Sequence, residues 1–406
     1  MGIIPTIGIE EEFFISPILS QEFKQADVAA IIKSLRLRVA GRVEDELFSN
    51  QVELKSGICS SISEIRRDVQ QNREDLKSVS ADFNCVAFAC GTHPLQDWSR
   101  VPRKTRGLRT PAYQTTIGDR MACCGMHIHL GADEDSRFAL YNFLRGFLPC
   151  LLALTTSSAF WEGRPTGMLS YRSSIFGGLP RGGLPPKLTG EQFNRYIDLL
   201  KTHCEPGELV QGHWFIRPTK LGTVEVRIMD VCPRIEDCVA VTALLHCLAV
   251  CFLSAPGRWQ SAPNSRPRRW LRRPNRAGST VAPQLLAVFD DPPPYLVAEA
   301  IWRVQREGLQ ALIFGQSDGK LSAFNISDII ALTLTELQKT AEMLGCHADL
   351  RRVDDIMTYG TSAQRQLSEY SNSLDTSKDR ARALASTLSS VLTDFGYREE
   401  ELRRRI

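Results

Sequence analysis

The chain has 406 residues, of which 43% are hydrophobic and 23% charged, an ordinary balance for a globular protein with a substantial core. Its formal net charge of +3 is too small to argue for a nucleic-acid-binding protein. We expect no membrane span and no secretory leader, because no apolar run approaches a span and no basic-then-apolar segment opens the chain. The twelve cysteines are then expected to be reduced, and the protein to be cytoplasmic.

The stretch from Thr6 to Ile15 predicts a β-strand that carries three consecutive glutamates. Because side chains alternate between the two faces of a strand, Glu10 and Glu12 lie on one face, about 7 Å apart, and Glu11 on the other. Two carboxylates on one face of a mostly apolar strand repel each other and lose hydration unless a cation lies between them. The alternative is an edge strand with solvated charges.

The next part of the chain predicts alternating helices and strands. Helices are expected over residues 26–38, 63–84 (with Ser63 as N-cap) and 138–160. Strands are expected over residues 42–56 (with a turn at Ser49-Asn50), 86–89 and 125–131. Glu53 falls in the second strand of the first pair, and His127 and His129 share one face of the last.

The second half begins with a segment, residues 163–186, that is too rich in glycine and proline for a regular element. We predict a functional lid or binding loop there. The remaining expectations are helices over 191–203 and 237–253, a hairpin of 214–216 with 223–231, an arginine-rich surface loop over 256–280, mainly helical structure from 283 onward and a polar turn over 360–366. Since no repeat or clear linker divides the sequence, we predict a single catalytic domain over residues 1–406.

Polar residues interrupt several of these apolar strands and are candidates for one common site: Glu10, Glu12, Glu53, His127, His129 and Glu225. Carboxylates with an imidazole suit hard divalent ions such as Mg²⁺ or Mn²⁺, and several clustered carboxylates would hold two or three ions that in turn hold a polyphosphate. Arg227 shares the strand face of Glu225, and its planar guanidinium matches a phosphate or a carboxylate. A metal-dependent hydrolase and a non-catalytic nucleotide-binding protein are the alternatives.

Six segments in this order carry a family resemblance: GIEEEF, QVELKSG, GMHIHLG, PTGMLSYRSSIF, WFIRPTKLGTVEVRIMD and GTSAQRQL. Together they resemble the glutamate–cysteine ligase superfamily, and more narrowly the bacterial carboxylate-amine ligases known as glutamate–cysteine ligase type 2. The resemblance implies an α+β, glutamine-synthetase-like fold, in which a curved antiparallel sheet lines a funnel and helices pack on its back. It also implies an ATP-dependent ligase that phosphorylates a carboxylate and lets an amine attack the acyl phosphate, which releases ADP and phosphate.

The resemblance also assigns roles to individual residues. Its implied metal ligands are Glu10, Glu12, Glu53, His127 and Glu225, with His129 at the second polar position of the same motif. Its implied catalytic residues are Glu53, Arg172 in the substrate loop, and Arg227, which contacts the transferring phosphate or the acid. Arg365, Thr361 and Ser362 are expected near the nucleotide. The implied cofactors are ATP and Mg²⁺, with Mn²⁺ as an alternative, and the implied partners are a small carboxylic acid and an amine or amino acid; a homodimer is one assembly to test.

Two positions depart from the family pattern. Relatives carry an acidic residue where this chain has Phe215, and the stretch around Arg268, Arg269 and Trp270 matches only in part. Neither departure affects the expected metal ligands. Both leave the substrates open, so a specialised ligase that joins another acid to an amine is an alternative to glutamate with cysteine.

Overall fold

The computed structural model describes residues 4–17, 25–39, 42–104, 118, 120–179, 181–203, 212–259, 281–317 and 320–405. Its centre is a seven-stranded sheet in the order β10-β11-β5-β1-β3-β2, with β4 also paired to β1, and every pairing in it is antiparallel. The strands are β1 (Ile7–Pro17), β2 (Val43–Asp45), β3 (Gln51–Lys55), β4 (Cys85–Phe88), β5 (Met126–Gly131), β10 (Ile216–Pro218) and β11 (Thr223–Val226).

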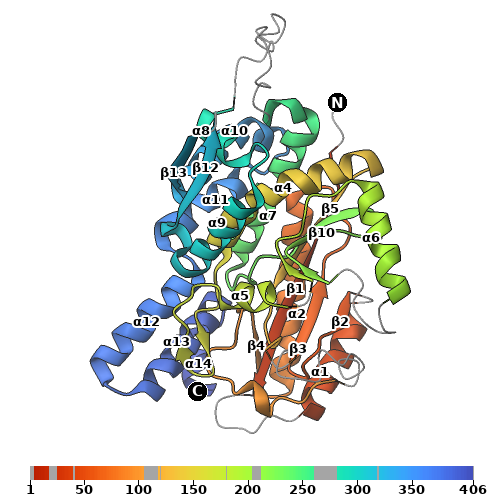
Figure 1. Ribbon diagram of the computed structural model, residues 1–406. Helices are drawn as coiled ribbons and strands as arrows, with labels where there is room; N and C mark the ends of the chain where they lie inside the picture. The colour runs from red at the N-terminus through yellow and green to blue at the C-terminus, as the bar shows by residue number, and fades with distance from the viewer. Residues whose placement is uncertain are drawn as a thin grey trace, which may run out of the picture.

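Three long helices cover one face of this sheet: α2 (Ile62–Asp82), α4 (Glu134–Thr155) and α7 (Ile235–Ser254) (Figure 1). Residues 238–252 of α7 are all buried, which is why this helix is apolar on every side. Contrary to the sequence expectation, α4 and α7 are long and apolar enough to cross a membrane. However, 89% and 83% of their most apolar windows are buried inside the protein, so their composition is that of core helices.

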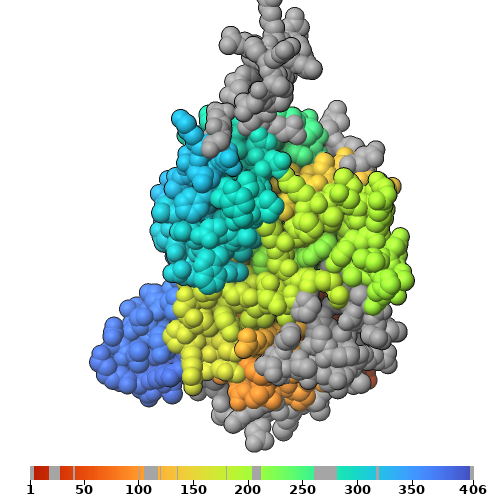
Figure 2. Space-filling view, in the orientation of Figure 1, coloured from red at the N-terminus to blue at the C-terminus, as the bar shows by residue number. Residues whose placement is uncertain are grey.

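The remaining elements surround this central unit. The helices are α1 (Gln25–Arg38), α5 (Tyr171–Gly177), α6 (Gly190–His203), α8 (Pro283–Phe289), α9 (Pro294–Glu307), α10 (Ile326–Met343), α11 (His347–Tyr359), α12 (Ser362–Ser377), α13 (Arg380–Asp394) and α14 (Glu399–Arg405). Short strand pairs are β6 (Phe160–Trp161) with β7 (Arg164–Pro165), β8 (Gly182–Gly183) with β9 (His213–Trp214), and β12 (Leu312–Ser317) with β13 (Lys320–Asn325). Helices α12 and α13 pack on each other and project from the main body (Figure 2).

Four local predictions differ from the structure. The N-cap of α2 is Ser61 rather than Ser63, because the Ser61 hydroxyl accepts a hydrogen bond from the Glu64 amide. The segment 163–186 contains helix α5, which Ser170 caps in the same way at Ser173. The expected turn over 360–366 is confined to its first residues, because Thr361 and Gln364 form a capping box and α12 begins at Ser362.

The fourth difference is the β12–β13 hairpin, which lies in a region predicted to be mainly helical. The arginine-rich loop expected over 256–280 lies mostly outside the described residues; of it, Pro256–Trp259 form a short 3₁₀ helix.

Candidate active site

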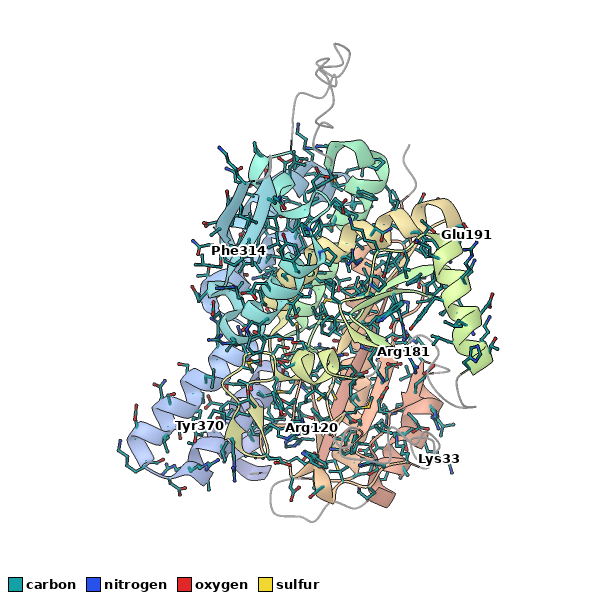
Figure 3. All side chains as sticks on the ribbon, in the orientation of Figure 1. Lys33, Arg120, Arg181, Glu191, Phe314 and Tyr370 are labelled. Atoms are coloured by element: carbon teal, nitrogen blue, oxygen red, sulfur yellow. The ribbon has the colours of Figure 1, made fainter. Side chains whose placement is uncertain are left out.

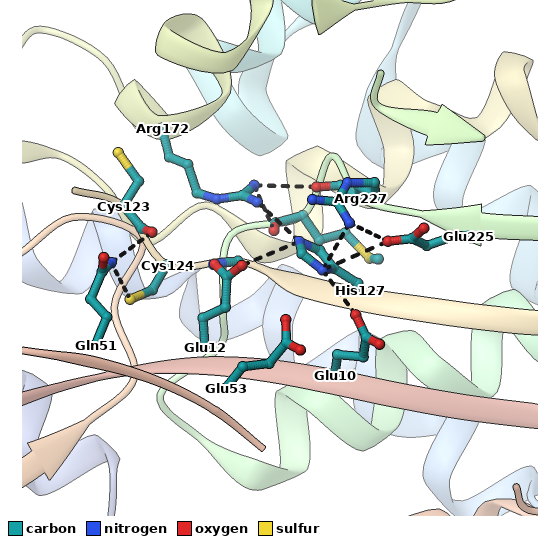
Figure 4. Close-up of polar contacts among 12 residues, drawn as sticks. Glu10, Glu12, Gln51, Glu53, Cys123, Cys124, His127, Arg172, Glu225 and Arg227 are labelled. Atoms are coloured by element: carbon teal, nitrogen blue, oxygen red, sulfur yellow. Dashed lines mark hydrogen bonds and ion pairs between the residues drawn. The ribbon is translucent and has the colours of Figure 1, made fainter. Parts of the chain in front are cut away.

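The register of the strands brings the predicted site residues to one face of the sheet. Glu12 lies opposite Glu53 on β3, and Glu10 lies opposite His127 on β5. His129 lies opposite Glu225 on β11. Figure 4 shows the side chains of Glu10, Glu12, Glu53, His127 and Glu225 converging on one place.

Glu11 points to the opposite face, as strand alternation predicts. There it forms a buried ion pair with Arg73 of α2, with 2.5 Å between Glu11 Oε1 and Arg73 Nη2. Arg73 also donates to the carbonyls of Cys232 and Pro233. This pair ties β1 to the helices behind the sheet, so Glu11 has a structural role.

Two groups of side chains have the composition of a site for a divalent cation. The first group is Glu10, His127 and Glu225, and the second is Glu12, Glu53 and His127; in each group the candidate ligand atoms lie within 4.8 Å of one another. Mostly carboxylate oxygens with one imidazole suit Mg²⁺ or Mn²⁺ rather than structural zinc. The residues present therefore fit the divalent ions that the resemblance implies.

His127 belongs to both groups but completes only one at a time. Its Nδ1 lies 3.4 Å from Glu10 Oε2 and its Nε2 lies 3.8 Å from Glu12 Oε1. Burial, and then the charge of Arg227, lower the pKa of His127, so the imidazole is neutral at ordinary pH. A neutral imidazole offers one ring nitrogen as ligand, and the other group needs a further donor.

Glu46 is a candidate for that donor, and the sequence analysis missed it. Burial, followed by the charges of Glu12 and Glu53, raises the pKa of the Glu46 carboxyl well above its usual value. Glu46 directly follows the last residue of β2, where strand alternation no longer gives the direction of a side chain.

Glu225 is held as a carboxylate by two arginines. Arg217 Nε lies 2.7 Å from Glu225 Oε2, and Arg227 Nη1 contacts Glu225 Oε1. Burial alone would raise the pKa of Glu225, but Arg227 and Arg217 hold it well below its usual range. Arg217 was also missed, although it lies directly opposite Glu225 in the hairpin register.

Glu53 has a different environment. Burial, and then the charge of Glu10, raise its pKa to about 8, and Lys55 only partly offsets these effects. Lys55 is a third missed residue: it lies two positions after Glu53 on β3 and opposite Glu10 on β1. A proton or a cation must therefore accompany Glu53 at neutral pH.

Arg172 is almost fully buried at one end of the site. Its Nη1 donates to the carbonyls of residues 227–229, with the shortest distance 2.9 Å to Met229 O, and its Nη2 lies 3.4 Å from His127 Nε2. The backbone of Gly125 leaves room for this guanidinium, since a Cβ there would lie 2.0 Å from Arg172 Nη2. Arg172 therefore holds the end of β11 and His127 in place.

On this side of the site, the charges of four guanidinium groups act on the imidazole of His213. Burial, and then the charges of Arg227, Arg217, Arg181 and Arg172, lower the pKa of His213 to about 3. Arg181 lies just after α5 (Figure 3). Two of these arginines, Arg217 and Arg227, pair with Glu225, and four positive charges on one side of the site attract anionic ligands.

The other end of the site opens into a cavity of about 590 Å³. Glu10, Lys55 and His129 line it where it meets the carboxylates, and Ile4, Ile58 and Leu221 are among its apolar residues. A cavity of this volume accommodates a ligand the size of a nucleoside.

The residues predicted near the nucleotide are engaged elsewhere. Arg365 Nε lies 2.9 Å from Asp394 Oδ2 and its Nη2 3.5 Å from Asp237 Oδ2. The Thr361 hydroxyl lies 2.6 Å from that of Thr156, and Ser362 is contacted by Gln366. None of these partners belongs to the carboxylate groups, so the nucleotide role of Arg365, Thr361 and Ser362 stays a prediction.

Residues 361–366 nevertheless connect to Arg172 through a buried network. Gln366 donates to the carbonyl of Ser157, whose amide donates to Asp230. Asp230 also accepts from the hydroxyls of Ser158 and Ser170, and the Ser158 hydroxyl accepts from the Arg172 amide at 3.0 Å. The segment thus supports the start of α5.

Comparison with known proteins gives the family of the chain. The family model described as "Glutamate-cysteine ligase family 2(GCS2)" matches residues 6–276, which include both carboxylate groups and all four arginines. The chain belongs to glutamate–cysteine ligase family 2. It is 30% identical over 397 residues to a putative glutamate–cysteine ligase 2 of Jannaschia sp. (strain CCS1), with 96% of each chain covered. It is also 30% identical over 398 residues to one of Herpetosiphon aurantiacus, with 96% of this chain and 94% of the relative covered.

Two solved structures share the fold. The glutamate–cysteine ligase of Francisella tularensis in complex with AMP gives a TM-score of 0.57 at 12% identity, covering 99% of this chain and 92% of that one. The bifunctional glutathione synthetase of Pasteurella multocida gives 0.58 at 13% identity, covering 96% and 53%. The predicted fold class, that of the glutamine-synthetase-like ligases, is confirmed. With the family shown, the chain is an ATP-dependent ligase that forms an amide bond.

Proposed function

We propose that this ligase joins a small carboxylic acid to an amine or amino acid, with Mg²⁺-ATP as the phosphoryl donor. The observation that carries the proposal is the order of three features along one sheet face: a nucleoside-sized cavity, the two carboxylate groups, and the four arginines. ATP, the phosphoryl donor, would bind at the cavity end, and the acid, its acceptor, would bind at the arginine end. The two would meet at the carboxylate groups.

The cavity would hold the nucleoside of ATP, with the triphosphate directed toward Glu10 and His129. Mg²⁺ ions bound by the first group (Glu10, Glu225, His127) and the second (Glu12, Glu53, Glu46) would neutralise charge on the transferring phosphoryl group. Mn²⁺ would serve in place of Mg²⁺, since both accept octahedral oxygen ligands.

The arginine end would hold the acid substrate. An unactivated carboxylate does not react with an amine, because its oxygen is a poor leaving group. Arg227 and Arg217 would orient the carboxylate so that one oxygen attacks the γ-phosphorus while the bond to ADP breaks. The amine nitrogen then attacks the carbonyl carbon of the acyl phosphate, loses a proton and expels phosphate.

Phe215 bears on the identity of the substrates. It is buried, lies two residues from both His213 and Arg217, and approaches α5, where a Cβ on Gly177 would be 3.6 Å from its ring. An apolar ring at the edge of the arginine region favours a less polar acid or amine than a pocket with a carboxylate would. Glutamate with cysteine, the pair named in the relatives, is therefore one candidate and a less polar pair is another.

The proposal is tested by ADP release with Mg²⁺-ATP and a panel of carboxylic acids, each with and without amines. Release that needs both an acid and an amine supports the ligase and identifies its substrates. Turnover of a substrate without ATP would favour a metal-dependent hydrolase, and failure to bind Mg²⁺-ATP would favour a non-catalytic relative.

Three further expectations stay predictions: a single catalytic domain over residues 1–406, a cytoplasmic location and, as one assembly to test, a homodimer. Limited proteolysis, cell fractionation and light scattering test them in that order.

A further inference from the structure

Lys55 occupies an unusual position for a lysine, at the centre of three carboxylates from three neighbouring strands. Its Nζ lies 2.9 Å from Glu10 Oε1 on β1, 3.0 Å from Glu53 Oε1 on β3 and 3.0 Å from Glu44 Oε1 on β2. One ammonium group is therefore the ion-pair partner of three carboxylates. Three carboxylate oxygens thus surround the ammonium, as they would surround a metal ion.

The fold fixes this position. Lys55 lies opposite Glu10 in the β1–β3 register, and Glu44 lies opposite Glu53 in the β2–β3 register. The Lys55 amide donates to the carbonyl of Arg42, and its carbonyl accepts from the side chain of Asn72. The lysine backbone is thus anchored on both sides, and its side chain has 28% of its surface exposed, at the wall of the cavity.

The neighbouring charges show what the ammonium does. Glu225, at one end, is already neutralised by Arg217 and Arg227. Glu10 and Glu53, which belong to different groups, share Lys55 on the side away from His127. Two divalent ions would occupy the two groups. The Lys55 ammonium occupies the space between Glu10, Glu53 and the cavity.

We infer that Lys55 is a built-in cation that takes the place of a third divalent ion, so that this ligase works with two metal ions per chain. The inference rests on the proposed metal-dependent function and specifies how its charge is balanced. Because its ammonium already pairs with three carboxylates, Lys55 acts by positioning and neutralising Glu10 and Glu53 and does not itself bind the polyphosphate. It is a positioning residue.

The test is a count of bound Mn²⁺ in the presence of a non-hydrolysable ATP analogue, by electron paramagnetic resonance of free Mn²⁺ and by elemental analysis of the desalted protein. Wild type is expected to bind two ions per chain and Lys55→Met three. The matched control is Lys77→Met, because Lys77 Nζ donates to the carbonyl of Gly396 behind the sheet; it is expected to bind two. A purely structural role for Lys55 would change stability without changing the count.

Three ions in wild type, or two in Lys55→Met, would overturn the inference. The wild-type count tests the inference even if Lys55→Met fails to fold without metal. That variant can also be purified in Mn²⁺ and its bound ions counted in the same way. Equal Mn²⁺ counts in wild type and Lys55→Met, together with ADP release by wild type, would overturn this inference but not the proposed function. No Mn²⁺ binding and no ADP release in any protein would overturn the proposed function with it.

Discussion

Arg217 and Glu225 face each other across the β10–β11 hairpin, with 2.7 Å between Arg217 Nε and Glu225 Oε2. Arg217 also donates to the carbonyl of Gly212, which fixes the direction of its guanidinium. The contact joins the arginine region to the first carboxylate group, so substrate binding and metal binding share Glu225. An acid substrate would meet a guanidinium that is already oriented.

Arg217→Gln is expected to raise the KM for the acid substrate by about 10- to 100-fold, since hydrogen bonds to charged groups contribute about 1.5–3 kcal/mol. Steady-state kinetics with saturating ATP measures this change. Arg195→Gln, which removes an exposed pair with Glu191 on α6, is the control and should leave the KM unchanged. An unaltered KM in Arg217→Gln would contradict the role of Arg217 in binding the acid.

Gly125→Ala is expected to lower kcat by at least about 100-fold while the protein stays folded. The new Cβ would lie 2.0 Å from Arg172 Nη2 and must displace the guanidinium that holds His127, and such a small displacement at a catalytic site is costly. Kinetics and circular dichroism measure the two effects. Gly257→Ala, which adds a Cβ where no atom lies within 4 Å, is the control; equal activity of both variants would exclude a positioning role for Arg172.

Metal binding is expected to depend on pH through Glu53. Because the pKa of Glu53 is about 8 without metal, an ion must displace a proton below that pH. The apparent affinity for Mn²⁺ should therefore rise from pH 6 to about pH 8 and then level off. Isothermal titration in buffers of different ionisation enthalpy measures the released proton, and Glu53→Gln should release fewer; equal release from both proteins would contradict the assignment.

The same raised pKa has a consequence for stability. Between the ordinary value of 4.5 and about 8, the folded metal-free protein keeps a proton that the unfolded chain has lost. The contribution of Glu53 to the free energy of unfolding therefore decreases as pH rises through this window. Urea unfolding of wild type and Glu53→Gln at pH 5 and pH 8 measures it, and a contribution that grows with pH would contradict this environment for Glu53.

Phe215→Asp is expected to change which acid and amine are used more than it changes ATP affinity. The side chain is buried near the arginine region, where a new carboxylate would compete with an anionic substrate and attract a cationic one. Relative kcat/KM across the substrate panel measures the shift, with Phe215→Leu as the control for lost ring volume. A change in ATP binding alone would place Phe215 away from the substrates.

Much of this site could be predicted because strand alternation is strict. Alternation predicts that Glu10 shares a face with Glu12 and that His127 shares one with His129, and the register brings both pairs to one face with Glu53 and Glu225. The same rule sent Glu11 to the helices, where it pairs with Arg73.

The missed residues show where that rule ends. Lys55 and Arg217 become recognisable only once the register is known, since each owes its role to the residue opposite it on the next strand. Glu46 lies just beyond the end of β2, where side-chain direction depends on tertiary contacts. Arg365 was placed near the nucleotide by the family resemblance; its guanidinium pairs with Asp237 and Asp394, and its nucleotide role stays a prediction.

The β12–β13 hairpin was missed for a different reason. Its two strands, LIFGQS and KLSAFN, are short and lie between the longer helices α9 and α10, while the sequence carries Asp318-Gly319, a dipeptide typical of hairpin turns, between them. The uniformly apolar α7 was predicted correctly, because a helix buried on all sides needs no amphipathic pattern.

The most direct test of the proposed function is ADP release by wild type and Glu53→Gln with Mg²⁺-ATP and the panel of acids and amines. Wild type should release ADP only when one acid and one amine are both present. Glu53→Gln should lose this activity while remaining folded, and Glu74→Gln, on the exposed side of α2, should retain it. Activity of Glu53→Gln equal to wild type would contradict the metal site, and no ADP release by wild type with any pair, together with no binding of Mg²⁺-ATP, would contradict the proposed ligase.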